Sequence, residues 1–212
     1  MSLLIAIDGP AAAGKGTLAR RLAAHFALPH LDTGLLYRAT GMRVLDAGGN
    51  PADVAAATAA ARMLCPDDLA RPDLRGPEAD QAAATVASIP AVRAALLDFQ
   101  RRFGRERGAV LDGRDIGTIV VPDATAKLFV TASAEARGRR RWLELRERGH
   151  QADLNEVIAL IRERDAQDRD RAAAPLVPAP DALLLDTTAL DADATFAEAL
   201  RLLRDARGIV HA

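Results

Sequence analysis

The sequence is poor in several residue types, and each scarcity narrows the possible functions. Cys65 is the only cysteine among 212 residues, so no internal disulfide can form and a reducing compartment is expected. Aromatic residues make up 3% and the net charge is -1, which disfavours base stacking and nucleic-acid binding. No apolar run approaches the roughly 18 residues of a membrane-spanning helix, and no charged leader precedes one. We therefore expect a cytoplasmic protein that binds neither nucleic acid nor a membrane.

The length and the apolar content indicate one globular unit. With half of its 212 residues hydrophobic, the chain can bury the core of a single domain, and a second large domain is not expected. We also expect a monomer.

Lysine is scarce as well. Lysine and arginine together number 28, but only Lys15 and Lys127 are lysines. A coding bias that replaces lysine by arginine on exposed surfaces accounts for most of this imbalance. Lys15 then stands out, because a compact ammonium group is the cation that reaches between phosphates.

Lys15 lies in the stretch GPAAAGKGT, which nearly matches the phosphate-loop pattern G-x-x-x-x-G-K-[ST]. The pattern places a hydroxyl directly after the lysine, whereas this chain has Gly16 there and Thr17 one position later. Glycines allow a tight turn that exposes backbone amides, and the next helix adds its positive N-terminal dipole. Loss of the usual hydroxyl predicts that Mg²⁺ is bound mainly by ATP phosphates and water. The predicted ATP-binding residues are Gly9, Pro10, Ala11, Ala12, Ala13, Gly14, Lys15, Gly16 and Thr17.

Apolar strands alternate with helical stretches along the chain. Strands are predicted for LLIAID, the segment ending at Asp32, GAVLDGRD, KLFVTA and ALLLDT. Helices are predicted at about 14–26, 35–47, 78–107 with a break at Pro90, 134–148, 153–171 and 193–206. Residues 50–80 carry four prolines and little periodicity, which indicates an insertion outside the sheet. Such alternation predicts an α/β fold with a mostly parallel sheet, in which the loops after Asp8, Asp32 and Asp112 meet at one edge.

Arginines follow two of these predicted strands and indicate a second anion site. Arg38 follows LDTG and Arg114 lies in DGRD. Transfer between two nucleotides needs fixed cations, and the arginine fork suits phosphate. Either arginine alone would more often be a surface ion pair. On the helix RERDAQDRDR, Arg164, Asp168 and Arg171 share one face, and spacing alone favours a solvated face.

Taken together, these segments resemble the bacterial cytidylate kinases. The matching segments are IAIDGPAAAGKGTLA, LDTGLLYRA, IPAVRAALLDFQRRF, LDGRDIGTIVVPDA, KLFVTAS and IRERDAQDRDRAAAPLVPAPDALLLDTT, which cover most of residues 3–188. The resemblance implies a P-loop kinase core with a five-stranded parallel sheet flanked by helices, within one domain over residues 1–212. It also implies a CMP-binding insertion at about 40–90 and a lid at about 143–155.

The resemblance also implies roles for individual residues. Lys15, Arg38 and Arg114 would be catalytic, with the two arginines holding the CMP phosphate that attacks the γ-phosphorus of ATP. The other implied substrate contacts are Thr33, Arg93, Asp115 and Arg171 around cytosine, and Arg164 and Asp168 at the sugar. A carboxylate facing N4 and arginines facing N3 and O2 match cytosine, whereas uracil presents O4 to Asp115.

The sequence departs from the family in two places. Ala84 replaces a serine near the base, so one hydrogen bond is missing or comes from Thr85 or water. The insertion MLCPDDLARPDLR is too short for the usual small sheet. In the lid, Arg146 or Arg148 is expected to close over the donor phosphates, with a solvated helix end as the alternative.

The predicted function is transfer of the γ-phosphoryl group of ATP to CMP or dCMP, with Mg²⁺ as cofactor. Two alternatives stay open. One is a broader UMP/CMP kinase, and the other is a nucleotide-binding regulator that does not transfer phosphate. The regulator gives no reason for Arg38, Arg114 and Asp115 to occur together.

Overall fold

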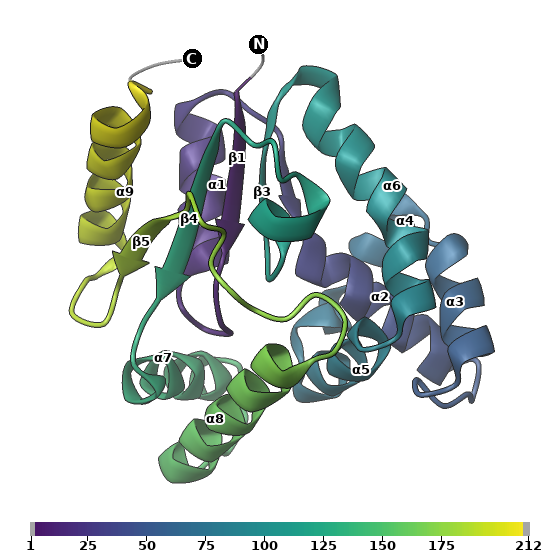
Figure 1. The fold of residues 1–212 in the computed structure, drawn as a ribbon. Coiled ribbons are helices and arrows are strands. Elements are labelled where there is room, and N and C mark those ends of the chain that lie inside the picture. Colours follow the sequence, from purple (N-terminus) through teal and green to yellow (C-terminus); the bar gives the residue numbers. More distant parts are fainter. Residues whose placement is uncertain (1–2, 210–212) are drawn as a thin grey trace.

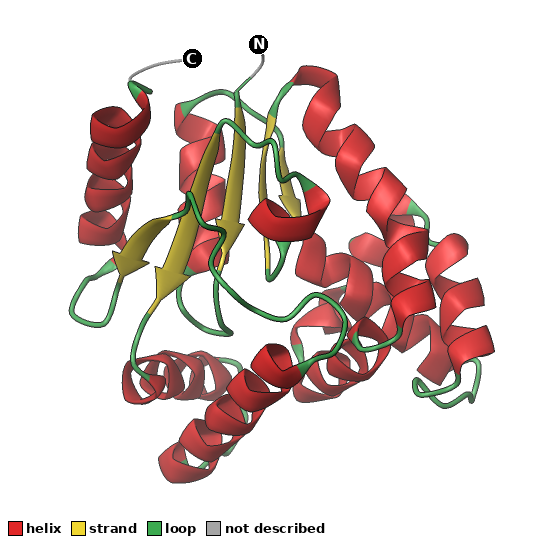
Figure 2. Ribbon diagram, in the orientation of Figure 1, coloured by secondary structure: helices red, strands yellow, loops and turns green. Residues whose placement is uncertain are grey.

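A computed structural model of the chain describes residues 3–209. Its centre is a sheet of five parallel strands in the order β2-β3-β1-β4-β5, with helices on both faces (Figure 1 and Figure 2). The strands are β1 (Leu4–Asp8), β2 (His30–Asp32), β3 (Ala109–Gly113), β4 (Ala126–Thr131) and β5 (Leu183–Asp186). The fold class and the five strands expected from the sequence are therefore confirmed.

The helices surround this sheet and extend beyond one end of it. They are α1 (Lys15–His25), α2 (Thr33–Asp46), α3 (Val54–Arg62), α4 (Pro66–Leu69), η1 (Pro72–Arg75), α5 (Pro77–Ala87), α6 (Pro90–Arg107), η2 (Ile116–Val120), α7 (Ala134–Glu147), α8 (Leu154–Asp170) and α9 (Ala192–Arg207). The α1, α2, α7, α8 and α9 predictions hold to within about two residues at each end.

The insertion is more regular than its sequence indicates. We expected little periodic structure at 50–80, yet α3, α4, η1 and the start of α5 lie there. The Asp53 carboxylate caps α3 by accepting hydrogen bonds from the amides of Ala55 and Ala56. Prolines begin α4, η1 and α5, a position where the missing amide hydrogen costs nothing. These prolines start helices, so the expectation of irregular chain was wrong.

The junction between α5 and α6 is bent by 99°. Ile89 adopts an extended backbone before Pro90, as the proline ring requires, and Pro90 begins α6. Among the described residues no single helix is long and apolar enough to cross a membrane, and only α5 and α6 taken together meet that test of length and composition.

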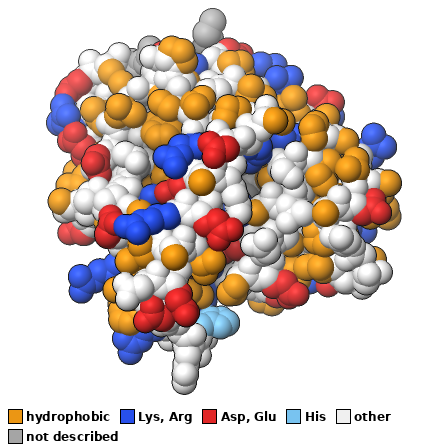
Figure 3. Space-filling view, turned by 60° about the horizontal axis from the view of Figure 1, so that its bottom comes forward, with side chains coloured by type: hydrophobic (Ala, Val, Ile, Leu, Met, Phe, Trp, Pro, Cys, Tyr) orange, Lys and Arg blue, Asp and Glu red, His pale blue; other side chains and the backbone are white. Residues whose placement is uncertain are grey.

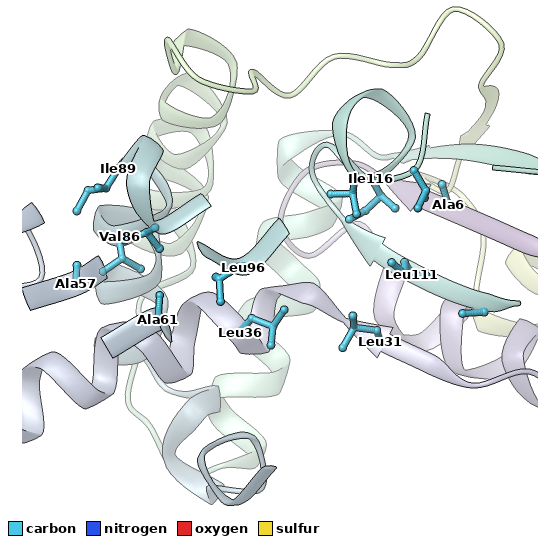
Figure 4. Close-up of a cluster of buried hydrophobic side chains, with 14 of the residues drawn as sticks. Ala6, Leu31, Leu36, Ala57, Ala61, Val86, Ile89, Leu96, Leu111 and Ile116 are labelled. Atoms are coloured by element: carbon cyan, nitrogen blue, oxygen red, sulfur yellow. The ribbon is translucent and has the colours of Figure 1, made fainter. Parts of the chain in front are cut away.

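Strand β1 shows how the core is divided. Alternate side chains of a strand point to opposite faces of the sheet. Leu4 and Ala6 pack in the cluster formed with α2, α3, α5, α6, η2 and β3, part of which is drawn in Figure 4. Ile5 and Ile7 pack on the other face, against α1 and α9. Every residue of β1 is buried, as expected for a central parallel strand.

The carboxyl ends of the strands meet at one edge of the sheet. Asp8 at the end of β1 pairs with Gly113 of β3, and Asp32 of β2 pairs with Asp112 of β3. In Figure 1 the strand arrows point towards α7 and α8, which lie side by side below this edge. The loops after Asp8, Asp32 and Asp112 are therefore neighbours, as the sequence predicts.

Candidate active site

The stretch from Gly9 to Thr17 forms a tight loop between β1 and α1. Gly9 has φ of 145°, and a Cβ atom at this position would lie 1.9 Å from the carbonyl oxygen of Val130. Gly14 has φ of 90° and directly precedes the first residue of α1. A side chain at Gly9 is excluded by β4, and both glycines adopt a backbone that other residues rarely take. The loop geometry is the one that the phosphate-loop pattern requires.

Two side chains hold the outer carbonyl groups of this loop. The Thr187 hydroxyl donates to the Ala13 carbonyl oxygen at 3.1 Å, and Nη1 of Arg137 donates to the Ala11 carbonyl oxygen at 3.3 Å. Arg137 is itself fixed by two hydrogen bonds to the Asp165 carboxylate, at 2.9 and 2.5 Å. Sequence reasoning missed Thr187 and Arg137, since both are more than 100 residues from the loop. These contacts fix the path of the loop, and backbone amides of such a loop are the donors that an anion requires.

Lys15 is buried at the floor of the loop. Its Nζ donates to the Pro10 carbonyl oxygen at 2.7 Å. Burial, and then the nearby charge of Arg114, lower the pKa of Lys15 to about 7. A phosphate beside Lys15 would stabilise the charged ammonium and raise this pKa again.

Gly16 and Thr17 bear on metal binding. The nearest atoms to a Cβ built on Gly16 are Nη1 of Arg20 at 3.6 Å and Oδ2 of Asp112 at 3.9 Å, so this position is open. The Thr17 side chain is exposed and its hydroxyl accepts a hydrogen bond from Arg20 at 3.3 Å. Within residues 3–209 there is no group of three or more His, Cys, Asp or Glu side chains able to hold a metal ion. A cation bound here would need most of its ligands from a phosphate ligand and water.

A cleft of about 550 Å³ runs from the loop towards α5, α7 and α8. Every predicted site residue except Gly9 and Pro10 lines it. Its described walls carry nine Lys or Arg side chains and seven carboxylates, so cations are in excess. Basic and acidic side chains also lie interspersed on the end of the molecule shown in Figure 3. The cations suit an anionic ligand, and the carboxylates can accept hydrogen bonds from polar groups of that ligand.

Arg38 and Arg114 occupy this cleft on the strand-end loops. Nε of Arg38 donates to Oδ1 of Asp80 at 2.9 Å, and Nη1 lies 4.0 Å from Oδ2 of Asp32. Nε of Arg114 donates to Oδ2 of Asp168 at 2.7 Å. Burial opposes ionisation of Asp168, but the charges of Arg114 and then Arg164 outweigh it and lower its pKa. Each guanidinium is held by one carboxylate and keeps further N–H donors for a ligand.

The residues expected at the base form a second group on the cleft wall. Arg93 of α6 donates to the Asp115 carboxylate and lies over the Tyr37 ring, 5.5 Å from its centre. The Thr33 hydroxyl donates to the Asp112 carbonyl oxygen at 2.8 Å. Asp115 and Arg93 thus offer an acceptor and donors side by side, from elements 22 residues apart.

Arg171 and Arg164 complete the α8 side of the cleft. Arg171 donates to the Ala174 carbonyl oxygen at 2.6 Å, and its Nη1 lies 3.9 Å from Oδ1 of Asp168. Arg164 lies 3.5 Å from the same Asp168 oxygen through Nε. Three arginines therefore surround one buried carboxylate, which explains why this helix face is not solvated as its spacing alone suggested.

The structure bears on the Ala84 departure and on the two lid arginines expected from the sequence. The Thr85 hydroxyl donates to the Gln81 carbonyl oxygen at 3.2 Å. Neither Ala84 nor Thr85 is among the residues that line the cleft. Of the arginines near Gly149, Arg146 lies over the Trp142 ring and Arg148 donates to the Arg75 carbonyl oxygen at 2.6 Å. From α7 it is instead Arg141 that lines the cleft, and our sequence reasoning did not single it out.

A parallel sheet flanked by helices, with a phosphate loop after β1 and a cation-rich cleft at the strand ends, defines the class of P-loop kinases. The sequence profile of the family described as cytidylate kinase matches residues 5–205, and the chain belongs to this family.

Individual relatives agree with that assignment. A cytidylate kinase from Paramagnetospirillum magneticum is 63% identical over 211 residues, covering 98% of this chain and 100% of that protein. A cytidylate kinase from Granulibacter bethesdensis is 62% identical over 204 residues, covering 96% and 98% of the two chains. Among solved structures, an uncharacterized protein from Eubacterium ventriosum is 13% identical with a TM-score of 0.56, covering 97% of this chain and 99% of that one, and it shares the fold.

Proposed function

We propose that this protein transfers the γ-phosphoryl group of ATP to CMP, and also to dCMP, giving ADP and the nucleoside diphosphate. The observation that carries the proposal is the joint presence of Lys15, Arg38 and Arg114 in one cleft with the loop from Gly9 to Thr17. A loop that only binds a nucleotide does not need two further arginines in the same cleft. Two facing groups of phosphate-binding residues suit a donor and an acceptor.

The loop binds the donor in this proposal. Backbone amides of residues 11–17 hold the inner phosphates of ATP, and Lys15 lies between the outer ones. Magnesium supplies charge neutralisation across the ATP phosphates when it is bound. Because Gly16 carries no hydroxyl, the ATP phosphates and water would supply most of the magnesium ligands.

Arg38 and Arg114 hold the acceptor phosphate in line with the γ-phosphorus. An oxygen of the CMP phosphate forms the new bond to phosphorus while the bond from phosphorus to the bridging ADP oxygen breaks. The attacking phosphate is already ionised at neutral pH, so no general base is required. Catalysis is then positioning and neutralisation by fixed cations, without a covalent enzyme intermediate.

Arg93, Thr33, Asp115 and Arg171 bind cytosine in this proposal. Arg164 and Asp168 bind the sugar hydroxyls. The Asp115 carboxylate accepts from the N4 amino group of cytosine, and it repels O4 of uracil. CMP is therefore the preferred pyrimidine acceptor.

We further propose that residues about 40–90 form the acceptor lobe and residues about 143–155 the lid. Leu145, Val157, Leu160 and Ile161 line the cleft from α7 and α8. Apolar side chains there exclude water when the lid closes, so that ATP is not hydrolysed.

An acceptor panel tests the proposal. The protein is incubated with Mg-ATP and CMP, dCMP, UMP, AMP or GMP, and formation of ADP and of the diphosphate is followed. We expect rapid turnover of CMP and dCMP and slower turnover of UMP. Equal turnover of UMP and CMP would make it a broader UMP/CMP kinase, and no turnover of any acceptor would support the silent regulator.

A further inference from the structure

Asp80 of α5 contacts arginines from three other helices. Its Oδ1 accepts from Nε of Arg38 on α2 at 2.9 Å, and its Oδ2 accepts from Nη2 of Arg141 on α7 at 2.7 Å. Its backbone carbonyl oxygen accepts from Nη1 of Arg164 on α8 at 3.1 Å.

The contact with Arg38 fixes how that guanidinium is presented. A guanidinium is planar, so a hydrogen bond at Nε sets the direction of both terminal nitrogens. Gly34 gives the group room, since a Cβ there would lie 3.2 Å from Nη1 of Arg38. Nη1 has a distant carboxylate neighbour, Asp32 at 4.0 Å, which leaves the terminal N–H groups available to a phosphate.

The contact with Arg141 joins the acceptor side of the cleft to α7. Arg141 also pairs with Glu144 one turn further along the helix, at 2.9 Å. The helix ends at Glu147, and Gly149 follows with φ of 81°, a backbone suited to a hinge between α7 and α8. Among the ion pairs of the described residues, Asp80 is the carboxylate that pairs with an arginine of α2 and with one of α7.

Only this position on α5 has such contacts. Glu78 lies in the same first turn of α5 and is exposed, and it carries the same charge. The two acids differ in their partners, but both place a negative charge near the N-terminus of α5, where the helix dipole favours it. Glu78 is therefore a matched control for Asp80.

We propose that Asp80 is a positioning residue that orients Arg38 for the acceptor phosphate and couples acceptor binding to movement of α7. This inference rests on the proposed CMP kinase activity. One carboxylate serves both arginines, so a displacement of Arg38 by the acceptor phosphate reaches Arg141 directly.

The first test compares Asp80→Ala and Asp80→Asn with Glu78→Ala. We expect Asp80→Ala to raise the KM and the calorimetric Kd for CMP about tenfold with kcat changed less than about threefold. Asp80→Asn should show a smaller loss of the same kind, and Glu78→Ala should match the wild type. Thermal unfolding verifies that each variant is folded. Wild-type CMP affinity in folded Asp80→Ala, or an equal loss in Glu78→Ala, would overturn the role.

The second test addresses the coupling. We expect Arg141→Ala to raise the CMP Kd severalfold, and the Asp80→Ala, Arg141→Ala double variant to be no worse than Asp80→Ala alone. Additive losses would mean that Arg141 acts on the ligand independently. Trp142, the only tryptophan, follows Arg141, so its fluorescence reports on α7. CMP should change this emission in the wild type and not in Asp80→Ala; no change in the wild type would refute the coupling.

The two proposals fail in different ways. A wild-type protein that turns over none of the acceptors disproves the kinase activity. A wild-type protein that turns over CMP, with an Asp80→Ala variant of unchanged CMP affinity, disproves only the role of Asp80.

Discussion

In the proposed assignment the donor half of the cleft consists of nine consecutive residues, Gly9 to Thr17, whereas the acceptor half takes its side chains from α2, α5, α6, α8 and the end of β3. In the donor half the polar groups are mostly backbone amides, shaped by the glycines and fixed by Thr187 and Arg137. In the acceptor half they are arginines, of which Arg38, Arg93 and Arg114 pair with carboxylates 22 to 54 residues away. A short local motif can therefore specify the first half, while the second depends on the whole fold.

Removing the one charged side chain of the donor half should have the largest effect. Lys15→Ala removes the cation between the outer phosphates, and we expect kcat to fall at least about 10³-fold, equivalent to about 4 kcal/mol. Steady-state kinetics with CMP measure this. Lys127→Ala is the matched control, because Lys127 is the other lysine of the chain and pairs with Asp181 away from the cleft. Activity above a tenth of the wild type in Lys15→Ala would show that the amides suffice alone.

Asp8, the last residue of β1 before the donor loop, gives a test through the stability of the protein. Its carboxylate is buried and accepts from the amides of Ile116 and Gly117, both at 2.7 Å. Burial raises the pKa of Asp8 to about 6, against these hydrogen bonds, which lower it. The folded state thus binds more protons than the unfolded state between about pH 4 and pH 6, so stability should decrease as the pH rises through this window.

The expected loss from this group is on the order of 3 kcal/mol over that window. Urea unfolding at a series of pH values measures it for the wild type, for Asp8→Asn and for Asp98→Asn, an exposed control on α6. The decrease should be smaller in Asp8→Asn and unchanged in Asp98→Asn. Identical pH profiles for the wild type and Asp8→Asn would contradict the raised pKa.

In the acceptor half, Asp115 should govern the choice of base. Asp115→Ala removes the acceptor for N4 of cytosine and also leaves Arg93 without its carboxylate. We expect kcat/KM for CMP to fall about 30-fold, equivalent to about 2 kcal/mol, and that for UMP to fall less. Parallel assays with both nucleotides give the ratio. Asp98→Ala should leave it unaltered, and an equal loss for CMP and UMP would remove Asp115 from base recognition.

The contrast between a local loop and side chains from distant elements also explains which features the sequence predicts. The strands, the loop and the arginines at the strand ends could be predicted, because each is a local pattern and the parallel sheet brings the loops together. Asp80, Arg137 and Thr187 could not, because their roles arise from contacts with residues 42 to 174 positions away. The helices of the insertion were missed because prolines that begin helices resemble prolines that interrupt them. The expected base and sugar contacts came from the resemblance to a family, because residue spacing alone does not predict them.

Ala84 gives the smallest predicted effect and the finest test of the acceptor half. On α5 the residues lining the cleft are Pro77, Asp80, Gln81, Ala83 and Ala87, and a period of 3.6 places Ala84 in the middle of that face. Ala84 is not among the residues that line the cleft, and its methyl group offers no hydrogen bond. Thr85 is turned away from the centre of this face and donates to Gln81.

We therefore expect Ala84→Ser to lower the KM for CMP about fivefold, equivalent to about 1 kcal/mol from one added hydrogen bond, with kcat unchanged. Thr85→Ala should leave KM unaltered, since its hydroxyl is engaged within α5. Kinetics of both variants with CMP and UMP decide between the two neighbours. If Thr85→Ala weakens CMP binding and Ala84→Ser does nothing, Thr85 supplies the base contact, and α5 must rotate about its axis when the acceptor binds.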